Sequence, residues 1–190
     1  MRNSIFLGLD NGNAYTKSSE GFICRSGFTK SDVEPITKQN LLIYKGIYYS
    51  IGSNRASVQL DKTQNQDAFI LSLAAIADAI AKAGIEQKAD VFIGVGLPIV
   101  HYGKMKHKFR EYFIRNNITF AFNGNDYNIN IIDCRVYPQS YAAFINIYRD
   151  YKDVSVANII DIGGYTTDFF IVENGIINTA TCYSLPNGVI

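Results

Sequence analysis

The 190 residues allow one ordinary domain, or one domain and part of a second. Hydrophobic residues make up 47% and charged residues 18%, which is typical of a globular, core-forming protein and excludes a disordered chain. Because 18 Lys and Arg balance 17 Asp and Glu, the net charge of +1 excludes a general field that would hold DNA or an anionic membrane.

The first part of the chain predicts short strands joined by tight turns. Three apolar runs favour an antiparallel meander: residues 4–9, 14–19 and 22–28. The polar residues 29–40 contain Pro35 and predict a loop. Residues 41–44 and 47–51 then predict a hairpin.

Helical periodicity appears in the second part of the chain. Apolar residues recur at helical spacing over 65–83, and Gly84 is placed to end that helix. The β-branched run 91–95 predicts a strand that ends at Pro98. The remaining expected elements are a helix over 102–115, strands over 118–122 and 127–132, a helix over 138–148 opened by Pro138, a strand over 156–160, and a hairpin over 167–172 and 176–181.

Two segments share one pattern, which is an apolar strand, an Asp and then Gly: Leu7 to Gly12, and Ile159 to Gly164. A strand that stops at Asp and turns through Gly exposes backbone N–H groups that can cradle phosphate oxygens. The Asp suits such a site if Mg²⁺ or its bound water lies beside it. Either turn alone is more often structural, but the pair favours a split phosphate clamp.

Polar side chains flank both turns. Lys17 follows Asp10 by seven residues, so on a returning strand its ammonium could reach the same phosphates. After the second turn, Thr166 and Thr167 add hydroxyl groups and Asp168 adds a second carboxylate.

These segments resemble the phosphate loops of the actin-like ATPase superfamily. Leu7 to Lys17 resembles the first loop, Ile160 to Asp168 the second, and Val136 to Ser140 the connecting motif that opens a helix. Gly94 to Pro98 is similar to the Gly-Leu-Pro strand end of the ParM or StbA plasmid-segregation actins. The resemblance covers about residues 4–188.

The resemblance implies an α/β, RNase H-like fold, with a three-stranded antiparallel meander followed by α-β-α units. It places a first domain over 1–155, with a small insert at 29–60, and the opening hairpin of a second, similar domain over 156–190. It also implies binding of ATP (or GTP) with Mg²⁺, slow hydrolysis, and self-association into cytoplasmic filaments. These would segregate plasmid DNA through a centromere-binding adaptor, without strong direct DNA binding and without a membrane.

The same resemblance assigns roles to individual residues. Asp10 and Asp168 would hold Mg²⁺ through water, and Asp168 and Gln139 would position the attacking water. The nucleotide-binding residues would be Asn11, Gly12, Asn13 and Lys17 on the β-phosphate side, and Asp161, Gly163, Gly164, Tyr165 and Thr166 on the γ-phosphate side. Orientation is the requirement, because phosphoryl transfer depends on positioning and charge neutralisation.

Two departures from the family pattern bear on activity. Gln139 stands where close ParM relatives often carry Glu, and a neutral amide orients water but is a poor base, so hydrolysis should be slow. The chain also carries the whole first half and only the start of the second, so we expect an N-terminal fragment that binds nucleotide weakly.

Other functions stay open at this point. The alternatives are a sugar or acetate-type kinase of the same superfamily, a non-hydrolysing actin-like scaffold, and a fragment that exchanges its 156–182 segment with another copy. The basic stretch 101–115 is typical of a solvated helix face, with contact to a partner as its alternative. His101 and His107 have no carboxylate partner close in sequence, so a metal site is not indicated there.

The three cysteines, Cys24, Cys134 and Cys182, show no CxxC or Cys/His spacing. Neither a zinc site nor a disulfide framework is indicated, and a reduced cytoplasmic compartment fits best. The longest apolar stretch, 68–83, is interrupted by Asp78 and falls short of a membrane span.

Overall fold

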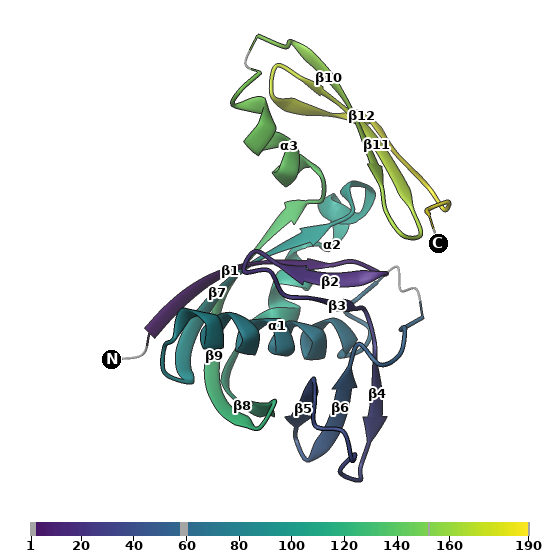
Figure 1. The fold of residues 1–190 in the computed structure, drawn as a ribbon. Helices are drawn as coiled ribbons and strands as arrows, with labels where there is room; N and C mark the ends of the chain where they lie inside the picture. Colours follow the sequence, from purple (N-terminus) through teal and green to yellow (C-terminus); the bar gives the residue numbers. More distant parts are fainter. Residues whose placement is uncertain (1–2, 58–60, 152, 190) are drawn as a thin grey trace. The chain divides into compact units, whose positions relative to one another are not determined.

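The computed structural model describes residues 3–57, 61–151 and 153–189. The chain forms two compact units (Figure 1). Unit 1 comprises Met1–Val95 and Lys108–Arg135, and unit 2 comprises Gly96–His107 and Val136–Ile190. The two units are defined by packing within this chain. They do not test the expected domain boundary after residue 155, which stays a prediction. The end of the expected 29–60 insert, residues 58–60, lies outside the described residues.

The helices and strands follow one another along the chain as Figure 1 labels them. They are β1 (Asn3–Asn11), β2 (Tyr15–Ser18), β3 (Ile23–Arg25), β4 (Phe28–Ser31), β5 (Leu41–Tyr44), β6 (Ile47–Ile51), α1 (Asp67–Ala83), β7 (Lys88–Leu97), α2 (Ile99–Phe113), β8 (Arg115–Phe122), β9 (Asn125–Pro138), α3 (Tyr141–Tyr148), β10 (Val156–Ile162), β11 (Thr167–Glu173) and β12 (Ile176–Leu185).

Nine strands form the larger sheet, in the order β3-β2-β1-β7-β9-β8-β5-β6-β4. β1, β2 and β3 pair antiparallel, which confirms the expected meander, and β1 then pairs in parallel with β7. The expected hairpin of β5 and β6 is also present. The parallel pair places the carboxyl end of β1, where Asp10 lies, at one edge of the sheet. Ligands commonly bind at such an edge in α/β proteins.

Helix α1 packs across one face of this sheet in unit 1. It contacts β1 and β2, and the Phe69 ring lies 5.8 Å from the Tyr44 ring of β5. Phe69, Leu73 and Ile76 are completely buried, as expected for a helix that is apolar on nearly all sides. Each such side chain contributes about 1.5–3 kcal/mol by leaving water, so α1 is the centre of the unit 1 core. The helix ends at Ala83 and is capped by Gly84, as predicted.

The basic helix differs from the prediction at its end. α2 ends at Phe113, and Arg115 begins β8, where it pairs with Ile131. The Arg115 guanidinium lies 3.8 Å from the centre of the Phe69 ring and donates to the Tyr112 carbonyl over 3.1 Å. The side chain therefore has partners in the core, which helical periodicity alone does not reveal.

The expected third strand, 22–28, is wrong as a single element. It is divided into β3 and β4, which pair with β2 and β6 respectively, and residues 29–31 are strand rather than loop. The cause is the bend at Ser26 and Gly27, where the Ser26 N–H donates to the Ala14 carbonyl over 3.0 Å. A Cβ at Gly27 would lie 2.4 Å from the Ala56 backbone nitrogen, so only glycine fits there.

The position of Pro138 also differs from the prediction. Pro138 ends β9 rather than opening a helix, and α3 begins at Tyr141. The Gln139 N–H donates to the Leu97 carbonyl over 2.9 Å, which extends the strand by one residue. Ser140 then has a φ of 64° and turns the chain into α3.

Unit 2 contains the smaller sheet, β10-β11-β12, which is an antiparallel meander like β1-β2-β3. The predicted 167–172 and 176–181 hairpin is confirmed. α3 contacts its β11–β12 turn, where the Tyr141 hydroxyl donates to the Gly175 carbonyl over 2.8 Å. Phe170 and Val172 are buried on the face that also carries Asp168.

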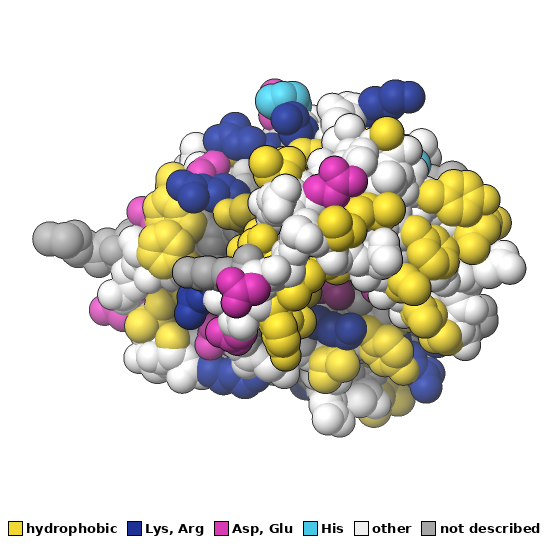
Figure 2. All heavy atoms as spheres, turned by 90° about the horizontal axis from the view of Figure 1, so that it is seen from above, with side chains coloured by type: hydrophobic (Ala, Val, Ile, Leu, Met, Phe, Trp, Pro, Cys, Tyr) yellow, Lys and Arg dark blue, Asp and Glu magenta, His cyan; other side chains and the backbone are white. Residues whose placement is uncertain are grey.

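The opposite face of the smaller sheet is apolar and exposed. Ile160 pairs with Phe169, which pairs in turn with Tyr183. Ile160 and Tyr183 are 58% and 56% exposed. Figure 2 shows hydrophobic side chains at several places on the surface, with basic and acidic side chains interspersed among them. Across the described residues, no helix is both long and apolar enough to cross a membrane.

Candidate functional site

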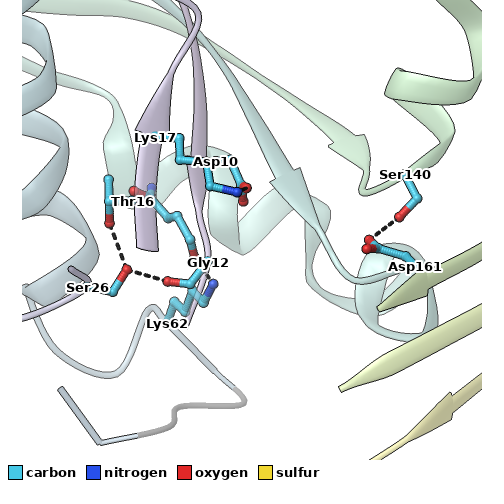
Figure 3. Close-up of polar contacts among 9 residues, drawn as sticks. Asp10, Gly12, Thr16, Lys17, Ser26, Lys62, Ser140 and Asp161 are labelled. Carbon is cyan, nitrogen blue, oxygen red and sulfur yellow. Dashed lines mark hydrogen bonds and ion pairs between the residues drawn. The ribbon is translucent and has the colours of Figure 1, made fainter. Parts of the chain in front are cut away.

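The first glycine turn follows β1 and carries a pair of opposite charges. Asp10 and Lys17 are directly opposite each other on β1 and β2, and the Lys17 Nζ lies 3.9 Å from the Asp10 Oδ2. Both side chains are about half exposed, at 49% and 54%. Figure 3 shows them together at the end of the strands. The predicted approach of Lys17 to the first turn is therefore present, as a solvent-exposed pair that contributes little to stability.

Asn11 is buried and is held from two sides. Its side-chain amide donates to the Ser72 hydroxyl of α1 over 3.2 Å, and the Lys62 ammonium donates to its backbone carbonyl. The Ser72 hydroxyl in turn donates to the Ala68 carbonyl over 2.8 Å. Asn11 is thus an internal anchor of the turn, acting through its side chain and its carbonyl.

The carbonyl of Gly12 is also held from inside. The Ser26 hydroxyl donates to it over 2.5 Å, and the buried Thr16 hydroxyl lies 3.0 Å from that of Ser26 (Figure 3). A Cβ at Gly12 would lie 2.7 Å from the Tyr15 carbonyl oxygen, so a side chain cannot be added without moving the backbone. The predicted need for glycine at this position therefore has a local steric cause.

The bonds from Lys62 to the Asn11 carbonyl and from Ser26 to the Gly12 carbonyl set the direction of the N–H groups in the turn. The C=O and N–H of a planar trans peptide point in opposite directions. Because the Asn11 and Gly12 carbonyls are bonded to Lys62 and Ser26, the N–H groups of Gly12 and Asn13 point away from those two side chains. Successive N–H groups with one direction form a concavity that binds anions.

A small cavity borders this turn. Its volume is about 30 Å³, and its lining includes Asn13, Thr16, Ser26, Lys62 and Asp67. The volume accommodates one or two water molecules and is far too small for a nucleotide. The cavity therefore supports the turn rather than holding a ligand of nucleotide size.

The second glycine turn is built around two carboxylates. Asp161 of β10 and Asp168 of β11 are directly opposite each other in the antiparallel pair. Asp168 is only 6% exposed, and its Oδ1 is buried without a hydrogen-bond partner among the described residues. Like charges facing each other across two strands are destabilising, which is typical of a site built for another purpose.

Burial raises the pKa of the Asp168 carboxyl above its ordinary value, and the neighbouring Asp161 raises it further. Hydrogen bonds from Ser184 and Thr166 and the nearby His101 act in the opposite direction. A buried carboxylate oxygen without a partner, facing a second carboxylate, fits a hard cation such as Mg²⁺. The described residues contain no cluster of three or more His, Cys, Asp and Glu, so water would supply most of the ligands.

The connecting motif lies against the strand end at Gly96. A Cβ at Gly96 would lie 2.7 Å from the Gln139 Cγ, so the Gln139 side chain covers this glycine. The Tyr141 N–H donates to the Gln139 carbonyl over 2.7 Å, which closes a γ-turn at Ser140. The Ser140 hydroxyl donates to the Asp161 Oδ2 (Figure 3). Within unit 2, the Gln139 side chain therefore lies against Gly96, and Ser140, which is adjacent to Gln139 in sequence, holds Asp161.

The other predicted residues of the second turn lie in one short backbone loop. The Gly163 N–H donates to the Thr166 carbonyl over 2.8 Å, which closes the turn. The segment 186–189 crosses this turn, and the Val189 N–H donates to the Gly163 carbonyl over 3.2 Å. Gly164 and Tyr165 contact Gly188 in the same region.

Sequence reasoning missed four residues of these two turns, namely Lys62, Ser26, Ser140 and His101. Only Ser140 belongs to one of the motifs, the connecting motif, and no role was assigned to it. Ser140 is adjacent to Gln139, which was the one available signal. Lys62 and Ser26 are 51 and 14 residues from the carbonyls that they hold, and His101 is 67 residues from Asp168, so no local pattern could identify them.

Comparison with known proteins gives a family and a fold. A family model described as the N-terminal domain of actin-like proteins matches residues 8–141. No sequence among the curated proteins matches the chain.

Three solved structures are similar to it. The psk41 ParM protein has a TM-score of 0.78 at 16% identity over 98% of this chain and 67% of its own. ParM of Bacillus thuringiensis, solved with ATP, has a TM-score of 0.73 at 18% identity over 98% of this chain and 62% of its own. AlfA from B. subtilis plasmid pLS32, solved as a filament, has a TM-score of 0.76 at 15% identity over 97% of this chain and 73% of its own. The chain thus spans about two thirds of the length of these structures.

Proposed function

Because the chain belongs to the actin-like proteins, whose N-terminal domain matches most of its length, we propose that it is the nucleotide-binding first part of a filament-forming ATPase for plasmid segregation. The observation that carries this proposal is the repeated strand–Asp–Gly turn, built once with outward N–H groups and once with paired carboxylates. Fold likeness to ParM and AlfA supports the filament and segregation roles.

The first turn supplies the groups that a phosphate chain requires. The N–H groups of Gly12 and Asn13 would donate to phosphate oxygens, and the Lys17 ammonium would offset their charge. Asn11 would fix the turn from the core through Ser72. Asp10 would hold Mg²⁺ through a water molecule.

The second turn supplies carboxylates and further backbone donors. Asp168, whose buried Oδ1 fits a cation, would hold Mg²⁺ through water, with Asp161 beside it. Mg²⁺, when bound, neutralises phosphate charge during transfer. Gly164, Tyr165 and Thr166 would contact the γ-phosphate side, mainly through their backbone, and Gly163 would position them by closing the turn through its own N–H.

Gln139 is the residue proposed to orient the attacking water. Its backbone is fixed by the bond to Leu97, and its side chain is held over Gly96. An amide accepts and donates hydrogen bonds without taking up a proton, so the water is oriented but weakly activated. Slow hydrolysis follows, which suits a filament whose lifetime depends on its nucleotide.

The partners proposed are other copies of the chain and a centromere-binding adaptor. A net charge of +1 supports an adaptor rather than strong direct contact with DNA. The ATP in the B. thuringiensis ParM structure supports a purine nucleotide as ligand, with ATP or GTP to be distinguished by experiment. A cytoplasmic location goes with these partners.

Calorimetry with Mg²⁺ and ATP, ADP or GTP tests the proposal, with light scattering recorded on the same samples. We expect weak binding and nucleotide-dependent scattering, and an Asp168→Ala variant should lose the magnesium dependence of binding. Absence of binding by the full chain would contradict the nucleotide-binding role. Scattering without nucleotide turnover would favour a scaffold, and turnover that requires a sugar or acetate would favour a kinase.

A further inference from the structure

We propose that Lys62 and Ser26 are positioning residues of the first turn, which hold the Asn11 and Gly12 carbonyls inward and so preset two N–H groups for a phosphate oxyanion. This proposal rests on the proposed function, since it concerns how the same turn binds a nucleotide. Neither residue lies in the phosphate-loop motif, and neither has to touch the nucleotide.

Lys62 is held in place by a turn of its own. The Asp61 carboxylate accepts from the Thr63 N–H over 2.9 Å and from the Thr63 hydroxyl over 2.5 Å. Its second oxygen pairs with Lys108 of α2 at 2.8 Å. The Lys108 ammonium, together with the hydrogen bonds from Thr63, lowers the pKa of Asp61 to about 2, so this carboxylate stays ionised at neutral pH. The position from which Lys62 reaches Asn11 is therefore fixed by charged and neutral hydrogen bonds.

Ser26 is fixed in a similar way from the other side. Its N–H donates to the Ala14 carbonyl over 3.0 Å, and its hydroxyl lies 3.0 Å from that of the fully buried Thr16. Its carbonyl accepts from the Ala56 N–H over 2.8 Å. With both backbone groups bonded, the Ser26 hydroxyl is placed to donate to the Gly12 carbonyl over 2.5 Å.

A lysine is an unusual choice for a purely structural bond. Burial lowers the pKa of Lys62 to about 8, with the negative charge of Asp10 acting against that shift. The ammonium therefore loses hydration in reaching Asn11, and a desolvated charge adds little stability by itself. The gain lies in preorganisation, because a turn already held in its binding conformation loses less conformational freedom when the anion binds.

The test compares two variants of Lys62 with a charge-matched control in the full chain. Lys62→Met removes the donor and the charge, whereas Lys62→Arg keeps both. Lys38→Met removes one charge from an exposed lysine that pairs with Glu34 at the surface. Two quantities are measured, namely Mg²⁺-ADP affinity by calorimetry and amide hydrogen exchange of Gly12 and Asn13 without nucleotide.

We expect Lys62→Met to weaken ADP binding about tenfold and to accelerate exchange of both amides by a similar factor, with little change in melting temperature. Lys62→Arg should retain most of the ADP affinity and most of the slow amide exchange, and Lys38→Met should change neither quantity. Ser26→Ala should accelerate exchange mainly at Asn13. Unchanged exchange in Lys62→Met would overturn the proposal, even if affinity falls, because the lysine would then act on the nucleotide through its charge alone.

The exchange measurement also separates this proposal from the proposed function. If the unmodified chain binds no ADP, the nucleotide-binding role fails, but the exchange rates still decide whether Lys62 holds the turn. If Lys62→Met does not fold, Lys62→Gln keeps a donor of shorter reach and should show an intermediate exchange rate.

Discussion

The two glycine turns begin from the same sequence pattern but are built in opposite ways. In the first turn, the acid Asp10 is half exposed beside Lys17, and the interior is occupied by side chains that donate to backbone carbonyls. In the second turn, the acid Asp168 is buried opposite Asp161, and one of its oxygens has no partner among the described residues. The first turn therefore pairs its carboxylate with an ammonium donor, whereas the second pairs its carboxylate with another acceptor.

This difference indicates what each turn is suited to bind. Outward N–H groups and an exposed ammonium favour an anion, while paired carboxylates with a raised pKa favour a cation. A magnesium nucleotide contains both an anion, the phosphate chain, and a cation, Mg²⁺. One sequence pattern therefore yields two complementary chemistries, and the residues that decide between them lie far from the pattern in sequence.

The strongest way to break this comparison is to remove the donors of the first turn. In Gly12→Ala, the new Cβ would lie 2.7 Å from the Tyr15 carbonyl oxygen, so the backbone has to move and the N–H groups lose their direction. We expect a loss of at least about thirtyfold in Mg²⁺-ADP affinity, measured by calorimetry. Gly103→Ala in α2 is the matched control, because nothing lies within 4 Å of its Cβ position. Equal affinities for the two variants would remove the first turn from the site.

The acceptors of the second turn are tested by Asp168→Asn. Because the folded-state pKa of Asp168 is raised above its unfolded value, the folded chain binds a proton more readily, and its stability falls as pH rises through that raised pKa. Neutralising the side chain should increase the free energy of unfolding by about 1–2 kcal/mol at neutral pH and abolish this pH dependence. Calorimetric melting between pH 4 and pH 8 measures both effects.

Magnesium provides the control for that variant. Millimolar Mg²⁺ should raise the melting temperature of the unmodified chain more than that of Asp168→Asn, since the carboxylate pair is incomplete in the variant. The same stabilisation in both would show that Asp168 does not hold the cation.

Much of the architecture was predictable from the sequence because it depends on local patterns. Period-two and helical runs predicted the first meander, α1 and the final hairpin. The two strand–Asp–Gly segments identified a family that the N-terminal-domain match confirms, and similarity to the ParM and AlfA structures confirms the α/β, RNase H-like fold class. Errors occurred at Ser26 and Gly27, and at Pro138, where distant backbone contacts override local preference.

The candidate site was predictable only in part, for a related reason. The residues within the motifs lie where the pattern places them, and their roles stay predictions. The residues that hold them, such as Lys62 and Ser140, act across the fold through single hydrogen bonds. A bond between residues 51 positions apart leaves no periodic or compositional signal.

The smallest expected effect concerns the backbone of Ser140, and it sharpens the comparison by separating strain from hydrogen bonding. The φ of 64° at this position is costly for any residue other than glycine. The Ser140 hydroxyl also donates a hydrogen bond to the Asp161 carboxylate. Ser140→Ala keeps the strain and loses the bond, whereas Ser140→Gly loses both. We therefore expect the glycine variant to be more stable than the alanine variant by about 1 kcal/mol in denaturant unfolding.

The relation of both variants to the unmodified chain then identifies what the turn requires. If the hydroxyl only stabilises the fold, Ser140→Gly should approach the stability of the unmodified chain and keep its response to Mg²⁺. If the hydroxyl holds Asp161 for a cation, both variants should lose part of the Mg²⁺ stabilisation, whatever their stability. A glycine variant less stable than the alanine variant would contradict the positive φ at Ser140 on which this reasoning depends.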